Sequence, residues 1–260
     1  MIVEYKDLDD LKEQAKTSLH ARFELSIAYV NGRFGRSNKV QAVKLLENLI
    51  ENDFAEAYFE LAHFYSQGFK GKNIDDAIDL CKMAYEKGHD RAANHVAWHY
   101  KEKNDEKQYV KWLNLEIKRD GPQSIYAIRS LADFYINKKS YKLAEKCLIN
   151  ADRKGCQESM FKLSELYCEG MLKDDGTKAI KFLRKTIATS KYHGDINRAR
   201  ARMGIFYILG YGLKMDKNKG MKMLMNASKK HDNIADKFIS TLPSNFITDF
   251  INDPKNGHEI

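Results

Sequence analysis

Small and apolar residues recur along the chain with the period of an α-helix. Six tyrosines follow one another at intervals of 32 to 40 residues: Tyr29, Tyr65, Tyr100, Tyr135, Tyr167 and Tyr207. Eight positions before each tyrosine stands a small residue, four before stands an aliphatic residue or methionine, and three before stands another small residue. Offsets of three, four and eight lie on one face of a helix with 3.6 residues per turn, so the pattern predicts six similar amphipathic helices.

A second helix is expected after each tyrosine helix, because another apolar stripe follows at a similar distance each time. It consists of a first residue that is often small, a large residue three positions later and an apolar residue directly after that one, as in Ala42, Leu45 and Leu46. A single hairpin of two such helices cannot cover its own apolar face, so neighbouring hairpins must pack against one another. The sequence therefore predicts an all-α protein built as an α-solenoid of about six αα-hairpins.

The repeats and the segments around them suggest a division of the chain. Residues 1–19 are predicted to form an N-terminal capping helix, residues 233–252 C-terminal capping helices, and residues 253–260 a flexible tail. The six repeats between them, in residues 20–232, are predicted at 20–54, 55–89, 90–121, 122–155, 156–195 and 196–232.

Glycines complete the pattern and point to a family. Gly32, Gly68, Gly170 and Gly210 each stand three residues after a tyrosine, where a linking turn needs positive φ, whereas repeats three and four have Lys103 and Lys138 there. With these glycines the chain resembles the Sel1-like branch of the tetratricopeptide superfamily from about residue 20 to residue 232. The resemblance implies a right-handed superhelix and a role as an adaptor or scaffold that binds other proteins.

Composition favours a soluble protein of a reducing compartment. The chain has 260 residues, which is enough to bury a core without disulfides, and its four cysteines form no C-x-x-C pair. Some members of the family join repeats through paired cysteines, and Cys147 with Cys156 is the one candidate pair here, but packing in the core is the more ordinary role for Cys81 and Cys147. The acidic first residues do not resemble a signal peptide, and no apolar run is long enough to span a membrane. We expect a cytoplasmic protein without membrane insertion.

No common catalytic motif is present, so we expect neither an enzyme nor a bound cofactor or metal. One arrangement leaves an alternative open. His95 and His99 stand four residues apart on one helix face, and Glu60 and His63 on the preceding tyrosine helix could add metal ligands, as in a metal-dependent enzyme. The simpler interpretation is that these imidazoles are solvated and form a polar surface around Trp98.

The inner face of the predicted solenoid is the candidate surface for a partner. The column five residues before each tyrosine changes from acidic to basic along the chain, through Glu24, Glu60, His95, Ser130, Lys162 and Arg202. Neighbouring columns add His63, Trp98, His99, Asp133 and Glu165. We expect these residues to contact another protein or a peptide.

Charge is distributed unevenly along the chain. Residues 1–60 carry 8 basic and 11 acidic side chains, a net charge of −3, whereas residues 195–231 carry 9 and 2, a net charge of +7. The basic end predicts a patch that suits an acidic partner segment, with nucleic acid as the alternative ligand. Its members are Arg198, Arg202, Lys214, Lys217, Lys219 and Lys222. For the chain itself we expect a monomer or a weak homodimer.

Overall fold

The computed structural model describes residues 7–33, 35–174 and 176–243. Every regular element in this part of the chain is a helix, which confirms the predicted all-α class. None of these helices combines the length and the apolar character needed to cross a membrane. Residues 244–252 of the predicted C-terminal cap and the predicted tail, 253–260, lie outside the described residues.

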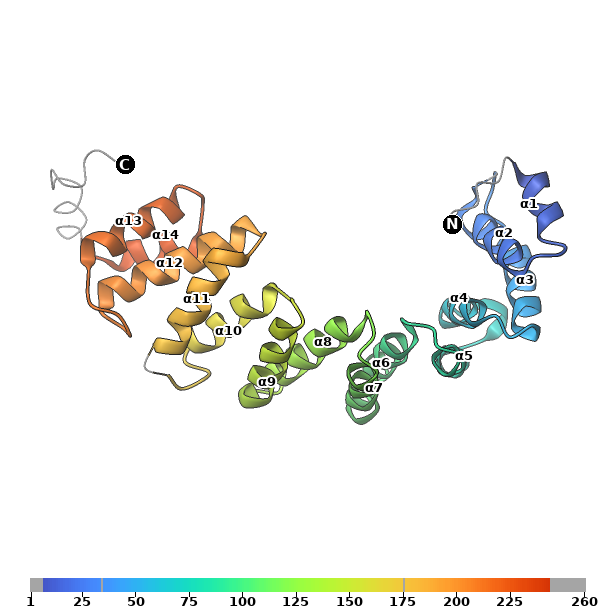
Figure 1. The fold of residues 1–260 in the computed structure, drawn as a ribbon, viewed down its shortest axis with the longest axis horizontal. Helices are drawn as coiled ribbons and strands as arrows, with labels where there is room; N and C mark the ends of the chain where they lie inside the picture. The colour runs from blue at the N-terminus through green and yellow to red at the C-terminus, as the bar shows by residue number, and fades with distance from the viewer. Residues whose placement is uncertain (1–6, 34, 175, 244–260) are drawn as a thin grey trace. The chain divides into compact units, whose positions relative to one another are not determined.

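The chain divides into two compact units, residues 1–127 and 128–260. In the first unit each helix packs against the next one along the chain, from α1 to α7, and the unit ends within the first turn of α8 (Figure 1). Its helices are α1 (Leu8–Gln14), α2 (Leu19–Asn31), α3 (Lys39–Glu51), α4 (Ala55–Ser66), the short 3₁₀ helix η1 (Phe69–Gly71), α5 (Ile74–Glu86), α6 (Ala92–Glu102), α7 (Glu106–Arg119) and the start of α8 (Ser124–Asn137).

The second unit contains the rest of α8 and the helices that follow it. Here too each helix from α9 to α14 packs against the next one, and α14 also packs on α12. The helices are α9 (Tyr141–Arg153), α10 (Glu158–Cys168), α11 (Thr177–Thr189), α12 (His193–Leu209), α13 (Lys217–Ser228) and α14 (Asn233–Thr241).

The positions that recur before the tyrosines form the core of both units. All eighteen of the small and apolar residues that stand eight, four and three positions before a tyrosine are buried. Of the tyrosines themselves, Tyr167 is buried and the other five are half-buried. The apolar period in the sequence therefore identified the packed face of each first helix.

The turns explain why glycine recurs after the tyrosine. Gly32, Gly68, Gly170 and Gly210 have φ of 64°, 78°, 72° and 68°, in the left-handed region that glycine adopts without steric cost. In repeats three and four, which lack this glycine, the positive φ falls one residue later, on Asn104 and Lys139, both at 56°. The turn thus needs one residue in the left-handed region, and in the two lysine-containing repeats this residue stands one position later.

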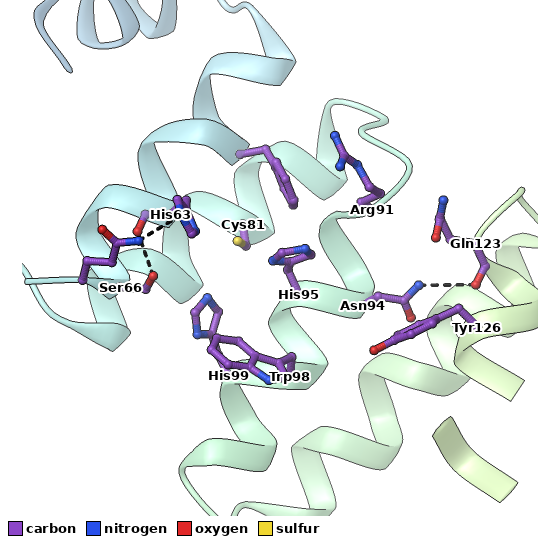
Figure 2. Close-up of a pocket in the computed structure, with 12 residues that line it drawn as sticks. His63, Ser66, Cys81, Arg91, Asn94, His95, Trp98, His99, Gln123 and Tyr126 are labelled. Atoms are coloured by element: carbon purple, nitrogen blue, oxygen red, sulfur yellow. Dashed lines mark hydrogen bonds between the residues drawn. The ribbon is translucent and has the colours of Figure 1, made fainter. Parts of the chain in front are cut away.

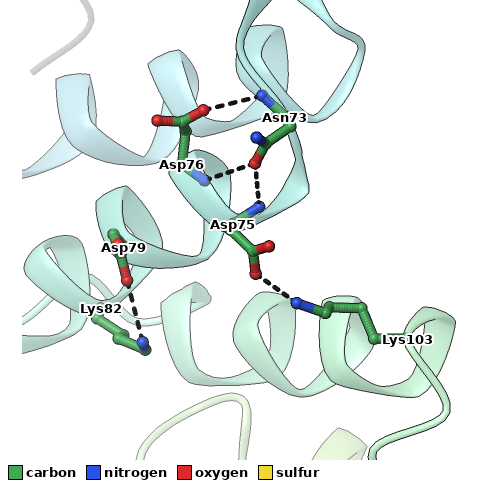
Figure 3. Close-up of polar contacts among 6 residues, drawn as sticks. All are labelled: Asn73, Asp75, Asp76, Asp79, Lys82 and Lys103. Atoms are coloured by element: carbon green, nitrogen blue, oxygen red, sulfur yellow. Dashed lines mark hydrogen bonds and ion pairs between the residues drawn. The ribbon is translucent and has the colours of Figure 1, made fainter.

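Most of the second helices begin at a residue whose polar side chain accepts hydrogen bonds from the first turn. Such a cap is favourable because the first backbone N–H groups of a helix have no partner within the helix. In α5 the side chain of Asn73 accepts hydrogen bonds from the N–H groups of Asp75 (2.7 Å) and Asp76 (3.2 Å), and Asp76 accepts one from the N–H of Asn73 (3.0 Å; Figure 3). Asp75 also pairs with Lys103 at the end of α6, so the same turn joins repeat two to repeat three.

The cysteines are free thiols. Cys81 is buried on the apolar face of α5, and burial raises the pKa of its thiol to about 12. Cys147 is half-buried and also packs in the apolar core, and burial raises its pKa to about 11. These thiols pack as small apolar groups.

Helices α12 and α13 approach most closely at two glycines. A Cβ atom on Gly220 would lie 2.6 Å from the carbonyl oxygen of Gly204 and 2.6 Å from Cγ1 of Ile208. A Cβ atom on Gly204 would in turn lie 2.8 Å from the carbonyl oxygen of Gly220. Backbone atoms cannot move aside as a flexible side chain can, so this crossing requires residues without a Cβ.

We therefore predict that Gly220→Ala destabilises the protein although alanine is the better helix former. Overpacking typically costs about 2 kcal/mol, which exceeds the gain in helix propensity of about 1 kcal/mol, so the free energy of unfolding in urea should fall by roughly 1 kcal/mol. The matched control is Gly194→Ala in α12, where no atom lies within 4 Å of the added Cβ. That variant should be as stable as the parent or slightly more so, and equal destabilisation of both variants would contradict the prediction.

Candidate functional site

The first unit contains a cavity of about 590 Å³ that collects several of the residues singled out in the sequence. Its walls come from α4, α5, α6 and the segment that leads into α8, and the side chains drawn in Figure 2 surround a common space. We call it the α4–α6 pocket. The lining residues are Phe59, His63, Ser66, Gln67, Cys81, Arg91, Asn94, His95, Trp98, His99, Gln123 and Tyr126.

Helix α6 supplies the central wall. Asn94, His95, Trp98 and His99 lie at positions i, i+1, i+4 and i+5, which share one face of a helix. Along this face exposure differs sharply, because Trp98 is 47% exposed whereas His99 is buried. The His99 imidazole lies 4.9 Å from the Trp98 ring, measured between ring centroids. His99 is therefore a wall of the pocket rather than an open surface residue.

Phe59 on α4 holds the aromatic groups together. Its ring stacks on the His89 imidazole at a centroid distance of 4.2 Å and meets the His95 imidazole edge-on at 4.4 Å. The guanidinium carbon of Arg91 lies 5.1 Å from the centre of the same ring, in cation–π contact. These contacts fix the start of α6 against α4 and so set the shape of the pocket.

The imidazoles of His95 and His99 are neutral near pH 7. Burial, together with the neighbours His99, Arg91, His63 and His89, lowers the pKa of His95 from its ordinary value of 6.5 to about 4. Burial also lowers the pKa of His99. A neutral imidazole has one donor and one acceptor nitrogen, so the wall of α6 offers hydrogen bonds without a formal charge.

Two buried polar atoms of α6 have no hydrogen-bond partner among the described residues. Asn94 donates through Nδ2 to the backbone oxygen of Gln123 at 3.3 Å, but its Oδ1 has no donor, and the Nδ1 atom of His99 is also unpaired. A buried polar atom left unpaired costs about 1–3 kcal/mol. The pocket therefore retains hydrogen-bonding capacity that the folded chain itself does not use.

The metal alternative gains no support from this geometry. Within the described residues no group of three or more histidine, cysteine, aspartate or glutamate side chains is placed to hold a metal ion. Glu60, considered as a further ligand, does not line the pocket, and burial raises the pKa of its carboxyl group. His63 does reach the pocket, but its Nε2 lies 2.9 Å from the amide nitrogen of Gln67.

Charged residues of the predicted contact columns pair with one another in the second unit. Lys162 binds Asp133 at 2.6 Å, and Arg202 binds Glu165 at 3.7 Å and Glu169 at 3.0 Å. The Arg202 side chain is only 13% exposed. These pairs join α8 to α10 and α10 to α12, so their charges hold neighbouring repeats together. Glu24 and Ser130 are half-buried, on α2 and α8.

The residues of the predicted basic patch have different surroundings. The guanidinium carbon of Arg198 lies 5.6 Å from the centre of the Phe161 ring, and Nζ of Lys219 lies 4.4 Å from the centre of the Tyr207 ring. Lys214 and Lys217 are exposed, and Lys222 is half-buried. Arg202 belongs to the internal pairs described above.

Sequence reasoning missed several of the pocket residues. Phe59 and Asn94 stand six positions before their tyrosines, and Arg91 and Tyr126 stand nine before theirs. The two columns are three residues apart and share a helix face, so a comparison of all columns could have found them. These columns lie about two turns before the tyrosine, farther from it than the columns from which the contact surface was predicted.

The low pKa of His95 leads to a prediction about stability. In the unfolded chain the imidazole recovers its ordinary pKa of 6.5, so between pH 6.5 and about 4 the unfolded state binds a proton that the folded state does not. Stability should therefore fall as the pH falls through this window, and His95→Gln should reduce the slope. The measurement is the free energy of unfolding in urea at a series of pH values.

The control is His193→Gln, which removes an exposed histidine of the second unit. Its slope between pH 6.5 and 4 should match that of the parent protein. If His95→Gln and the parent lose stability in parallel over this window, then His95 is not the group that titrates.

Comparison with known proteins places these features in a family. The model of the Sel1 repeat matches residues 19–53, 55–89, 157–188 and 197–228, which together make up just over half of the chain. The segment between the second and third matches contains the two repeats that have Lys103 and Lys138 in place of glycine. A comparison of the sequence with curated proteins gave no match.

Two solved structures share the fold at low sequence identity. A protective antigen of uropathogenic Escherichia coli strains that displays an SLR fold is 21% identical, with a TM-score of 0.64, over 88% of this chain and 50% of that one. A Sel1 repeat protein from Oxalobacter formigenes is 19% identical, with a TM-score of 0.56, over 90% of this chain and 69% of that one. The chain thus spans half the length of the E. coli protein. The matched repeats, the helical hairpins and the buried small residues show that this chain belongs to the Sel1 repeat family.

Proposed function

We propose that the chain is a non-catalytic scaffold that binds a partner protein by taking an apolar or aromatic side chain of that partner into the α4–α6 pocket. Sel1 repeat proteins are generally scaffolds for protein interactions, and this proposal assigns the contact to particular residues. The observation that carries it is the exposure of Trp98 and Tyr126, at 47% and 55%, beside a cavity of about 590 Å³.

Large exposed aromatic rings beside a cavity are typical of binding sites. Tryptophan and tyrosine are enriched among the residues that dominate binding energies, because they bury a large area and lose little side-chain entropy. A cavity of this size lies within the range that holds small molecules or a protein side chain with its neighbours. Trp98 and Tyr126 would close over such a side chain.

The polar groups of the pocket indicate what else the partner needs. Oδ1 of Asn94, which has no donor in the described part of the chain, would accept a hydrogen bond from the partner if a small rotation of the side chain uncovered it. Arg91 adds a positive charge beside the aromatic floor. A tyrosine or tryptophan side chain, with an apolar ring and one donor, combines both requirements.

The proposal predicts that Trp98→Ala and Tyr126→Ala each weaken capture of the partner from cells of the native host. A dominant interface residue is worth about 2 kcal/mol or more, which corresponds to roughly thirtyfold in affinity. The matched control is Tyr192→Ala, which removes an aromatic ring that is equally exposed in the second unit. Mass spectrometry of the captured proteins, with isotope labels for the parent and each variant, measures the difference. Equal capture by all variants would disprove the proposal.

Trp98 also provides a direct optical test. The chain has two tryptophans, and Trp112 is buried, so the Trp112→Phe variant leaves Trp98 as the sole reporter. On binding of the captured partner, or of a peptide from it that contains an aromatic residue, the Trp98 emission should shift to the blue and its quenching by acrylamide should decrease. Unchanged quenching in a saturated complex would place the partner elsewhere.

A further inference from the structure

The second unit contains another concave surface, and its character is different. It is a cavity of about 880 Å³ formed by the turn before α9, the first turns of α9, the end of α10 and the loop into α11. Five lysines line it: Lys139, Lys142, Lys146, Lys173 and Lys178. We call this surface the lysine groove.

Among the described residues that line the groove there is one carboxylate, and it is already engaged. Glu145 accepts a hydrogen bond from the Tyr167 hydroxyl, and Nζ of Lys178 lies 3.8 Å from the same carboxylate and donates to the Tyr167 hydroxyl at 3.2 Å. These three side chains join α9, α10 and α11 within the unit. The pairing neutralises Lys178 and is the ion pair that the described part of the groove contains.

Asp174, in the loop into α11, is also engaged in the fold. Asp174 accepts hydrogen bonds from the backbone N–H groups of Lys178 (2.7 Å) and Ala179 (3.1 Å), and so caps α11. Lys139, Lys142, Lys146 and Lys173 have no ion-pair partner within the part of the chain that the structure describes. Four like charges that converge on one concave surface raise the local potential and favour an anionic ligand.

The start of α9 adds to this potential. Its N-cap, Ser140, makes no side-chain cap hydrogen bond, and the first turn has no acidic residue. By contrast, α3, α5, α7 and α13 begin at an asparagine or aspartate whose side chain accepts from the first turn. The partial positive charge of this helix end therefore acts together with the lysines, which carry the main charge.

Apolar side chains distinguish among anionic ligands. Leu143 and Met171 line the groove and are 43% and 38% exposed. Nucleic acid binding without sequence readout relies on exposed aromatic rings for base stacking, and the exposed apolar residues here are aliphatic. A peptide that carries both carboxylates and apolar side chains matches lysines interleaved with Leu143 and Met171.

We propose that the lysine groove binds an acidic segment of a partner protein, with glutamate or aspartate side chains paired to Lys142, Lys146 and Lys173 and an apolar side chain packed on Leu143 and Met171. The site is separate from the α4–α6 pocket, since it lies in the other unit and rests on different residues. It is also distinct from the basic patch predicted at the C-terminal repeats.

The probe for this proposal is a fluorescein-labelled peptide of glutamates and leucines, titrated with the full-length protein in an anisotropy assay. Binding should weaken with added salt, because exposed ion pairs are screened over about 8 Å at physiological ionic strength. A variant with Lys142→Glu, Lys146→Glu and Lys173→Glu should bind the peptide at least about tenfold more weakly, since three attractive pairs become repulsive. Replacement of the same lysines by glutamine should produce a smaller loss in the same direction.

The matched control reverses three exposed lysines of the same unit outside the groove, Lys181, Lys191 and Lys229, and so changes the net charge equally. This control variant should bind the labelled peptide with an affinity within about twofold of that of the parent protein. Circular dichroism and urea midpoints compare the folding of the variants, and the glutamine variant replaces the charge-reversed one if the latter is less stable.

Three results would overturn the proposal. The first is an equal loss of peptide affinity in the groove variant and the control variant. The second is equal binding of a peptide that has glutamine in place of glutamate. The third is tighter binding of a labelled oligothymidylate of matched charge, which would assign the groove to nucleic acid. Trp98→Ala distinguishes the two sites, because a change in the α4–α6 pocket should leave binding of the acidic peptide to the lysine groove unchanged. Each of the two sites can therefore fail without the other.

Discussion

Close contact between small residues is the constraint on which this fold depends. A hairpin of two short helices has an apolar face that it cannot cover, and the next hairpin covers it only if the backbones approach closely. The alanines, serines and glycine at the recurring small positions are all buried for this reason. Gly204 and Gly220 show the extreme case, because there the backbone oxygen of one helix occupies the space of the other's missing Cβ.

The same geometry brings fixed columns of neighbouring repeats together. The residue nine before one tyrosine meets the residue six before the preceding tyrosine, as in Arg91 on Phe59 and Arg198 on Phe161. The residue five before one tyrosine likewise meets the residue two before the preceding one, as in Lys162 with Asp133. Charges in these columns therefore stabilise the stack, and we propose ligand sites where polar groups are left without partners in the described part of the chain. Histidines and an asparagine lie together at the α4–α6 pocket, and four lysines that have no ion-pair partner among the described residues gather at the lysine groove.

Both proposed sites involve the two repeats that depart from the family pattern. Helix α6 supplies the central wall of the α4–α6 pocket, and the first turns of α9 with the turn before it supply much of the lysine groove. In that turn Lys138 and Lys139 stand where other repeats have the glycine that ends the first helix. The regular repeats carry the residues that stacking requires, whereas the irregular ones are free to carry other chemistry.

The sequence by itself determined the helical class, the packed face of each first helix and the positions of most left-handed turns, because these depend on the periods of apolar residues and glycines within one hairpin. It also indicated His63, His95, Trp98 and His99 as one group. Only the tertiary structure decided that His99 is buried, that Arg202 is held by Glu165 and Glu169, and that the lysines near α9 converge. These properties depend on which residue of the next repeat lies opposite. Because the repeats differ in length, the number of residues between two facing side chains is not constant along the chain.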